Sequence, residues 1–196
     1  LQPIWNHRGK RGSVAYLHKP DLEIEQEGSE LGIRYDVRPR HKGIDPLLFL
    51  DMRAGRRKLK MSAEKKTVLN LFSYTCGLGI AAMLGGAKEV VNVDFSGHAL
   101  EVANRNAKMN GIDDEDFVLL QQDAIPVMRQ FAGLGVKGRA RRRDHMRFQR
   151  RSFDLVVLDP PRYAKSPFGL VDTVGDYQSL FKPALLSTRN RGSMLV

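Results

Sequence analysis

Each of four apolar runs in the sequence is followed at once by residue types suited to binding or chemistry. These residues are the glycine turn with Gly77 and Gly79, and then Asp94, Asp123 and Asp159. If the four runs are parallel strands of one sheet, their carboxyl ends meet at one edge, which is where open α/β sheets bind ligands. The spacing therefore predicts a single site at that edge.

The turn NLFSYTCGLG (70–79) carries two glycines at the start of an expected helix. Glycine lets the backbone pass close to a ligand, and the amides of a helix N-terminus can face that ligand. The full dinucleotide fingerprint G-x-G-x-x-G is absent, and a lone G-x-G also occurs in many tight strand-to-helix turns. Taken alone, this turn leaves both interpretations open.

Two acids follow the next two apolar runs. Asp94 ends the second run, where a carboxylate can accept both hydroxyl groups of a ribose, as in adenosine binding. Asp123 follows the third run, where a carboxylate can accept from the adenine amino group. Each acid has a structural alternative, a helix cap for Asp94 and an ordinary strand-end acid for Asp123. Together with the glycine turn, the two acids indicate an adenosine-type cofactor lying across the sheet edge.

The segment DPPRY (159–163) follows the fourth apolar run. Its two prolines remove two backbone donors, so neither a strand nor a helix continues there. A carboxylate or carbonyl held rigidly at Asp159 or Pro160 can bind an amine and orient its lone pair, while Tyr163 can stack on an extruded base. A proline pair that only ends the strand is the alternative. At the edge of a cofactor site, the segment favours methyl transfer to a base nitrogen.

Apolar runs alternate with helical patterns from residue 67 onward, which is typical of right-handed βαβ units and a parallel sheet with helices on both faces. We expect strands at 67–72, 89–94, 116–122, 153–159 and 193–196. We expect helices at 80–87, 96–111, 124–134 and 174–192, the last of them kinked at Pro183. Earlier in the chain, we expect short strands at 13–18 and 31–37 and a helix at 50–66.

The sequence divides into an N-terminal extension with short strands, residues 1–45, and a binding domain, residues 46–196. The last strand only begins at residue 193. We therefore expect the sheet to be truncated, with its C-terminal strands missing, or to be completed by a partner.

Composition narrows the class of protein. The net charge is +10, and the segment 137–151 holds Lys137, seven arginines and one aspartate, with Phe148 among them. Such a block is a footprint for RNA or DNA, with an inert basic insert as the alternative. Neither a membrane span nor a secretory signal is expected from the apolar runs. The single cysteine, Cys76, indicates a reducing compartment, either cytoplasmic or organellar.

Three segments together resemble the class I S-adenosylmethionine-dependent methyltransferases, and in particular those that modify 23S ribosomal RNA of the large subunit. They are LGIRYDV…GIDPLLFLDMRAGRR, VLNLFSYTCGLGIAAMLGGAKEVVNVDFSGHALEVANRNAKMNG and FDLVVLDPPRYAKSPF. The resemblance covers about residues 28–196. It implies a Rossmann-like fold, S-adenosylmethionine as the cofactor, methyl transfer to RNA and contacts with ribosomal or ribonucleoprotein partners.

The resemblance also implies roles for individual residues. Asp51 and Arg53 would belong to an element that closes over the cofactor. Asp94 would hold the ribose, Phe95 would pack on the adenine face and Asp123 would bind the adenine. The residues that would line the methionine side are Tyr74, Thr75, Cys76 and Gly77. Asp159 and Pro160 would form the reactive end.

Some features depart from the family pattern. Asn70 stands where many class I enzymes carry an acid, the basic insert 137–151 is extra, and the N-terminal RNA-binding module of the ribosomal RNA enzymes is missing. A 5-methylcytosine product would need a cysteine nucleophile, but the residue after the two prolines is Arg162, Cys76 belongs to the turn, and any cysteine in a later strand would lie beyond residue 196. A base nitrogen is therefore favoured as the acceptor. The rival hypotheses are an inactive component of a ribonucleoprotein and a methyltransferase of small molecules or proteins.

Overall fold

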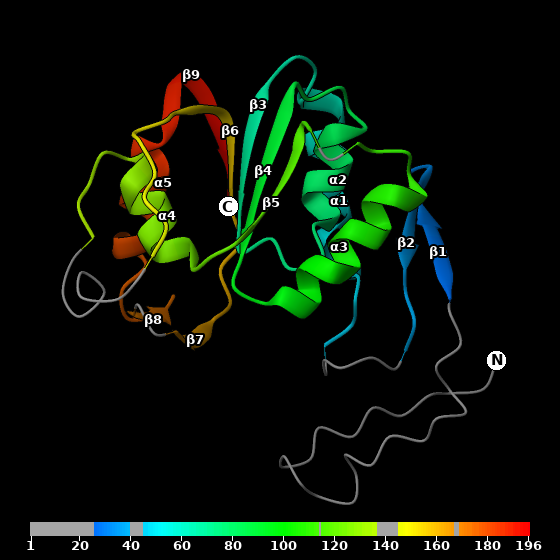
Figure 1. Ribbon diagram of the computed structural model, residues 1–196, viewed down its shortest axis with the longest axis horizontal. Coiled ribbons are helices and arrows are strands. Elements are labelled where there is room, and N and C mark those ends of the chain that lie inside the picture. The colour runs from blue at the N-terminus through cyan, green and yellow to red at the C-terminus, as the bar shows by residue number, and fades with distance from the viewer. Residues whose placement is uncertain (1–25, 40–44, 114, 137–144, 167–168) are drawn as a thin grey trace, which may run out of the picture.

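The computed structural model describes residues 26–39, 45–113, 115–136, 145–166 and 169–196. At its centre is a five-stranded parallel sheet in the order β5-β4-β3-β6-β9 (Figure 1). Its strands are β3 (Thr67–Leu71), β4 (Glu89–Asp94), β5 (Phe117–Gln121), β6 (Phe153–Leu158) and β9 (Thr188–Leu195). The chain runs outward from β3 to β5 and returns to β6 on the other side of β3, so the strand order reverses between β3 and β6. The predicted parallel α/β sheet is confirmed.

Helices cover both faces of the sheet (Figure 1). One face carries α1 (Arg53–Ser62), α2 (Gly77–Met83) and α3 (Gly97–Met109), and the other carries α4 (Ala124–Phe131) and α5 (Gln178–Leu186). A short 3₁₀ turn, η3 (Leu50–Met52), leads into α1. All five residues of β3 are buried, because apolar side chains meet a helix layer on either side.

An antiparallel hairpin of β1 (Glu27–Glu30) and β2 (Ile33–Asp36) packs beside α1 and α3. Ile33 and Tyr35 of this hairpin are buried in the same core as the three helices. The strand predicted at 31–37 is confirmed, whereas the strand predicted at 13–18 lies outside the described residues. The division at residue 45 remains a prediction, and the described hairpin shares its core with the sheet domain.

Two parts of the chain after β6 differ from expectation. A second hairpin, β7 (Tyr163–Ser166) and β8 (Gly169–Asp172), follows the prolines and was not predicted. The helix predicted to reach residue 192 ends at Leu186, and β9 begins at Thr188 rather than at 193. The hydroxyls of Ser187 and Thr188 donate to the carbonyl oxygens of Pro183 and Ala184, and so satisfy the last helical turn.

Among the described residues, no helix combines the length and the apolar character that crossing a bilayer requires.

Gly79 holds α2 close to the sheet. A Cβ atom at this position would lie 2.0 Å from Oδ1 of Asn92 and 3.2 Å from Nδ2 of Asn70. Both asparagines are buried, and Nδ2 of Asn70 donates to Oδ1 of Asn92 over 2.9 Å. The second glycine of the turn is therefore needed for packing of the helix on a buried polar pair.

We expect Gly79→Ala to lower the free energy of unfolding by about 1–3 kcal/mol, because Asn92 or the helix backbone must move. Gly77→Ala is the matched control, since its Cβ would meet Leu48 at an ordinary 3.5 Å. Urea unfolding of the two variants measures the difference. Equal losses of stability in both would contradict the packing role of Gly79.

Candidate functional site

A cleft of about 580 Å³ opens at the carboxyl edge of the sheet. Its walls come from the turn after β3, the ends of β4 and β6, and the segment 45–56 that leads through η3 into α1. The cleft lies where the strand order reverses, at the edge for which the sequence predicts a site.

The turn between β3 and α2 has an unusual backbone. Phe72, Tyr74 and Cys76 have φ values of 56°, 48° and 59°, in the left-handed region that non-glycine residues seldom occupy. Such conformations are costly and persist only where the surroundings fix them. Here the fixing contacts are a bond from the Tyr74 N–H to Oδ2 of Asp94 (2.8 Å) and one from the Thr75 hydroxyl to the Leu47 carbonyl (2.6 Å).

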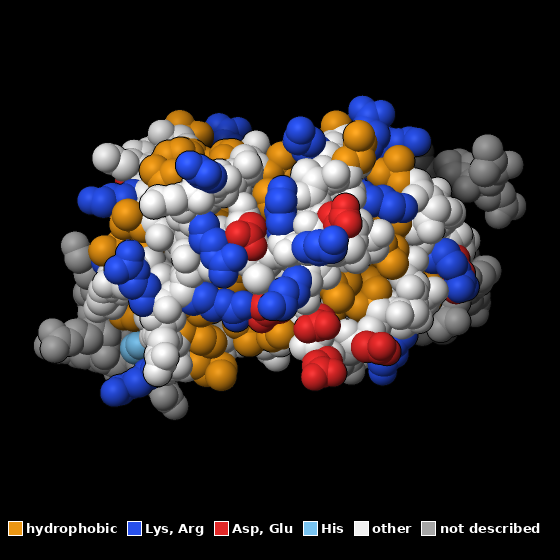
Figure 2. Space-filling view, turned by 90° about the horizontal axis from the view of Figure 1, so that it is seen from above, with side chains coloured by type: hydrophobic (Ala, Val, Ile, Leu, Met, Phe, Trp, Pro, Cys, Tyr) orange, Lys and Arg blue, Asp and Glu red, His pale blue; other side chains and the backbone are white. Residues whose placement is uncertain are grey.

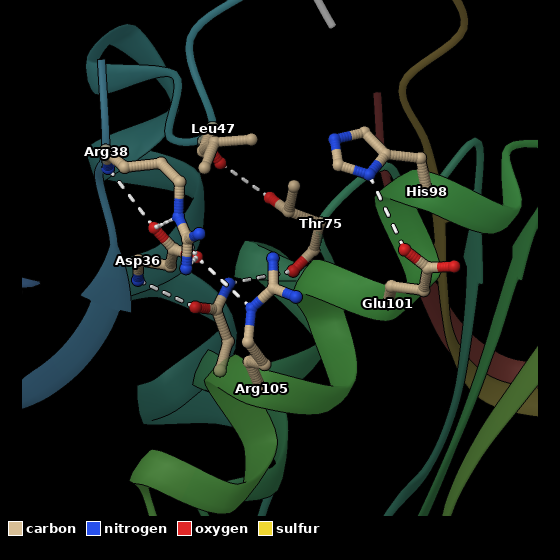
Figure 3. Close-up of polar contacts among 8 residues, drawn as sticks. Asp36, Arg38, Leu47, Thr75, His98, Glu101 and Arg105 are labelled. Atoms are coloured by element: carbon tan, nitrogen blue, oxygen red, sulfur yellow. Dashed lines mark hydrogen bonds and ion pairs between the residues drawn. The ribbon is translucent and has the colours of Figure 1, made fainter. Parts of the chain in front are cut away.

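The helix α3 and the N-terminal hairpin brace this turn from behind (Figure 3). The fully buried side chain of Asn106 donates to the Thr75 carbonyl (3.3 Å) and accepts from the Asp36 N–H (2.8 Å). The Asp36 carboxylate in turn accepts from Arg38 and from Arg105 of α3. The turn is thus held by Asp94 of β4, by the carbonyl of Leu47 and by Asn106 of α3.

Asp94 lies at the end of β4 and is 8% exposed. Burial raises the pKa of its carboxyl group, and the N–H groups of Ser96, Tyr74 and Phe95 oppose that shift. Oδ1 accepts from the Ser96 N–H (2.9 Å) and Oδ2 from Tyr74. Ser96 caps α3 by accepting from the Ala99 N–H, as predicted. The neighbouring Phe95 lines the cleft with 58% of its surface exposed.

The opposite wall consists of residues that follow β6. Asp159, Pro160, Pro161 and Ala164 line the cleft. Partial burial raises the pKa of the Asp159 carboxyl, and the Asp51 carboxylate across the cleft adds to the shift. Tyr163 is absent from the lining and is 57% exposed, because alternation along β7 turns Ala164 toward the cleft instead.

The segment 45–56 supplies the remaining wall. Phe49 packs its ring against Tyr74, with 5.7 Å between ring centroids. Burial raises the pKa of Tyr74 to about 12, helped by the carboxylates of Asp45 and Asp94. Arg56 is 2% exposed and lines the cleft. Its guanidinium donates to both carboxylate oxygens of Glu30 (2.7 and 3.1 Å) and to the Phe49 carbonyl (2.8 Å).

The structure brings most of the predicted site residues to one cleft. Those that line it are Asp51, Tyr74, Thr75, Gly77, Asp94, Phe95, Asp159 and Pro160. Those outside its lining are Arg53, Cys76, Gly79, Asp123 and Tyr163. Asn70, which stands where many class I enzymes carry an acid, also lines the cleft.

Three residues outside the lining have other contacts. Arg53 is exposed, with Nε 3.9 Å from the Glu30 carboxylate. Cys76 is fully buried, and burial raises the pKa of its thiol. Asp123 caps α4 through a bond from the Ile125 N–H (2.8 Å), while its Oδ2 is buried without a hydrogen-bond partner among the described residues.

Sequence reasoning missed Arg56. In the predicted helix at 50–66, Arg56 and Leu59 lie three residues apart on one face, and these are the two buried residues of α1. A helical-face analysis would have marked Arg56 as a buried cation, which needs a partner. The acid that supplies it, Glu30, comes from a strand that was not predicted.

We expect Arg56→Gln to destabilise the protein by about 3 kcal/mol at neutral pH, because it leaves the buried Glu30 carboxylate without its cation. The hydrogen bonds from Arg56 hold the pKa of Glu30 below its ordinary 4.5, so this stabilisation is present above pH 4.5 and is lost as the pH falls below it. The stability gap between wild type and variant should therefore narrow on acidification. Urea unfolding at neutral and acidic pH tests this, with the exposed Arg57→Gln as control. A gap that does not depend on pH would contradict it.

Comparison with known proteins agrees with this geometry. A family model described as S-adenosylmethionine-dependent methyltransferase matches residues 6–188. The ribosomal RNA large subunit methyltransferase I of Aeromonas hydrophila is 35% identical over 173 residues, which are 87% of this chain and 39% of that protein. Its counterpart in Aeromonas salmonicida is 34% identical over 171 residues, with the same two shares.

Among solved structures, SMU.776 in complex with SAH matches with a TM-score of 0.73 and 27% identity, over 91% of this chain and 43% of that one. This chain thus spans well under half the length of these relatives. The extent of the family match, together with the fold, shows that the chain belongs to the S-adenosylmethionine-dependent methyltransferase family.

Proposed function

We propose that this domain transfers a methyl group from S-adenosylmethionine to RNA, with a base of large-subunit ribosomal RNA as the acceptor. The observation that carries the proposal is that Asp94 and Asp159 both line one cleft, at the point where the strand order reverses. The names of the relatives support RNA as the substrate class.

The charge of the cleft suits this cofactor. Four carboxylates, those of Asp45, Asp51, Asp94 and Asp159, belong to residues in its lining. The lining cation, Arg56, is already paired with Glu30. S-adenosylmethionine carries a sulfonium, an ammonium and a carboxylate, so its net charge is positive, and an acidic cleft with low-dielectric walls attracts such a cation. The residues present therefore fit the cofactor.

Polar groups also fit the adenosine part. The two Asp94 oxygens accept backbone N–H groups, and a carboxylate has further lone pairs that can accept a donor such as a ribose hydroxyl. Asp123, just after β5, keeps an Oδ2 without a hydrogen-bond donor among the described residues, but this oxygen is buried outside the cleft lining, so an adenine amino group could reach it only after it becomes exposed. Phe95, which follows Asp94 in the chain, offers an exposed ring in the cleft lining.

When bound, S-adenosylmethionine supplies a methyl group activated by the sulfonium. The chain then has to align the acceptor with that methyl group and exclude water. The two prolines at 160 and 161 stiffen the backbone after Asp159, so the Asp159 carboxylate and the Pro160 carbonyl can bind an amine of the base in a fixed position. Phe49 and Tyr74 form an aromatic wall across from them. Tyr163 lies outside the cleft lining, so stacking on the base falls to the aromatic residues that line it.

The RNA contact assigned to the segment 137–151 rests on charge alone. Within its described part, Phe148 packs against Phe131 at 5.2 Å between ring centroids, so its ring belongs to the core. Arg147 and Arg150 are exposed. Contacts with ribosomal or ribonucleoprotein partners, and a cytoplasmic or organellar location, are further proposals that follow from an RNA substrate.

The acceptor atom that we propose is a base nitrogen, whose amine Asp159 or Pro160 can bind. Cys76, the single cysteine of these 196 residues, is fully buried and lies outside the cleft lining, so its own thiol is not placed for attack on a pyrimidine ring. Mass spectrometry of nucleosides from methylated RNA distinguishes a nitrogen product from 5-methylcytosine, and the latter would refute this assignment.

Asp94→Asn tests the cofactor site. The variant keeps an oxygen acceptor for the turn but loses the charge, so we expect S-adenosylhomocysteine to bind about 10- to 100-fold more weakly. Isothermal titration calorimetry measures this, with the exposed Asp116→Asn as the matched control. Unchanged affinity would refute the ribose assignment. A folded wild type that binds no S-adenosylhomocysteine would favour the inactive component.

Asp159→Asn tests the acceptor side. We expect the methyl-transfer rate to ribosomal RNA to fall about 100-fold, because the acceptor loses its alignment, while the affinity for S-adenosylhomocysteine stays within about threefold. Transfer from labelled S-adenosylmethionine to RNA and to a protein extract is measured side by side. Transfer to protein alone would replace RNA as the substrate, and an unchanged rate in the variant would remove Asp159 from the reaction.

A further inference from the structure

A second charged surface lies at the opposite end of the sheet from the cleft, where the strands begin. We call it the amino-edge basic face. It comprises residues just before β3, β4 and β6 and within the first half of β9, namely Lys65, Lys66, Lys88, Arg150, Arg151, Arg189 and Arg191. Figure 2, which views the molecule from that end, shows Lys and Arg side chains spread across the surface.

Backbone contacts fix the lysines of this face as neighbours. The Lys88 N–H donates to the Lys66 carbonyl (2.8 Å), and the Lys65 N–H donates to the Gly86 carbonyl (2.7 Å). Three lysines from two turns that are distant in sequence are thus held side by side on the ordered frame of the sheet. Two of them, Lys65 and Lys88, are exposed, and Lys65 adopts a left-handed φ of 58°.

The acids among these residues are matched with cations. Three further acids, Asp113, Glu115 and Asp116, precede the edge strand β5 and are exposed beside the face, since the Val90 N–H donates to the Asp116 carbonyl (2.8 Å). Glu89 pairs with Arg151, and Asp154 pairs with Arg189 (2.8 Å) while also accepting from the Thr67 N–H. Glu64 lies 3.8 Å from Lys65, an exposed pair of little strength. Among the described residues, the remaining four cations, Lys66, Lys88, Arg150 and Arg191, have no ion pair, so the face carries a net positive charge.

We propose that the amino-edge basic face binds the phosphate backbone of the RNA substrate at a distance from the acceptor nucleotide. The inference rests on the proposed RNA substrate. The six residues of β6 separate this face from Asp159, a span of about 20 Å. An RNA that reaches from one to the other gains phosphate contacts that position it without reading its sequence. The arginines at 147–151 lead directly into this face.

The test is the double variant Lys65→Asn/Lys88→Gln, since asparagine tolerates the left-handed backbone at residue 65. The control is Arg57→Gln/Lys182→Gln, which removes two exposed cations from α1 and α5. Binding of protein-free bacterial 23S ribosomal RNA is measured over a salt series, and S-adenosylhomocysteine binding is measured in parallel. We expect the test variant to bind RNA about tenfold more weakly, with a salt slope reduced by about 1.4, and to keep its cofactor affinity.

The outcomes separate this inference from the proposed function. If wild type binds the RNA and the test variant binds it as wild type or the control does, the face has no role in RNA binding. If the test variant loses affinity for polyglutamate and not for RNA, the face serves an acidic protein and the inference is overturned. If wild type binds S-adenosylhomocysteine but not RNA, the RNA substrate itself is refuted.

Discussion

The carboxylate of Asp94 is the interaction on which the rest of the site depends. Its two oxygens receive N–H groups from the turn after β3 and from the segment that starts α3. Without this acceptor, the N–H of Tyr74 in its left-handed conformation has no partner. The turn after β3 and the start of α3 then lose the side chain that links them. Because the group is buried, its charge is already costly, and a ligand that donates to it relieves that cost.

The topology explains why the chemistry gathers at one end. The strand order reverses between β3 and β6, so α2 and the β6 end diverge and leave room for a ligand between them. Because helices cover both faces of the sheet, its two ends stay exposed, and these two ends can differ in charge. One end collects aspartates around a cleft, while the other collects lysines and arginines at β3, β4, β6 and β9 and three acids before β5. This arrangement suits a cationic cofactor at one end and, at the other, a polyanion on the part of the edge away from β5.

The sheet and its strand ends were predictable because β3, β4 and β6 are buried on both faces and therefore read as continuous apolar runs. The cap at Ser96 was predictable for a local reason, since its hydroxyl serves an amide three residues on. The helical face of α1 could have marked Arg56 as buried, but its partner Glu30 could not be predicted, because it comes from a strand 26 residues earlier. Local pattern does not say which acid meets a buried cation.

The residues that were predicted to lie in the cleft but lie outside it are placed there by packing. Tyr163 was expected to stack on a base, but a strand rather than a loop follows the prolines, and its alternation decides which side chain faces inward. Gly79 was expected beside the ligand and instead lies against two buried asparagines. Asp123 combines a cap with a spare oxygen, so the structural and functional interpretations of that acid are compatible.

Because Cys76 is fully buried, the accessibility of its thiol reports local unfolding of this part of the chain. Its thiol is the only one in the sequence, and burial together with the raised pKa keeps it from alkylating reagents in the folded state. Because it sits in the turn that Asp94 anchors, labelling requires that turn to come away from the sheet. The rate of thiol modification under native conditions therefore measures how often the cofactor end of the molecule opens, without any added probe.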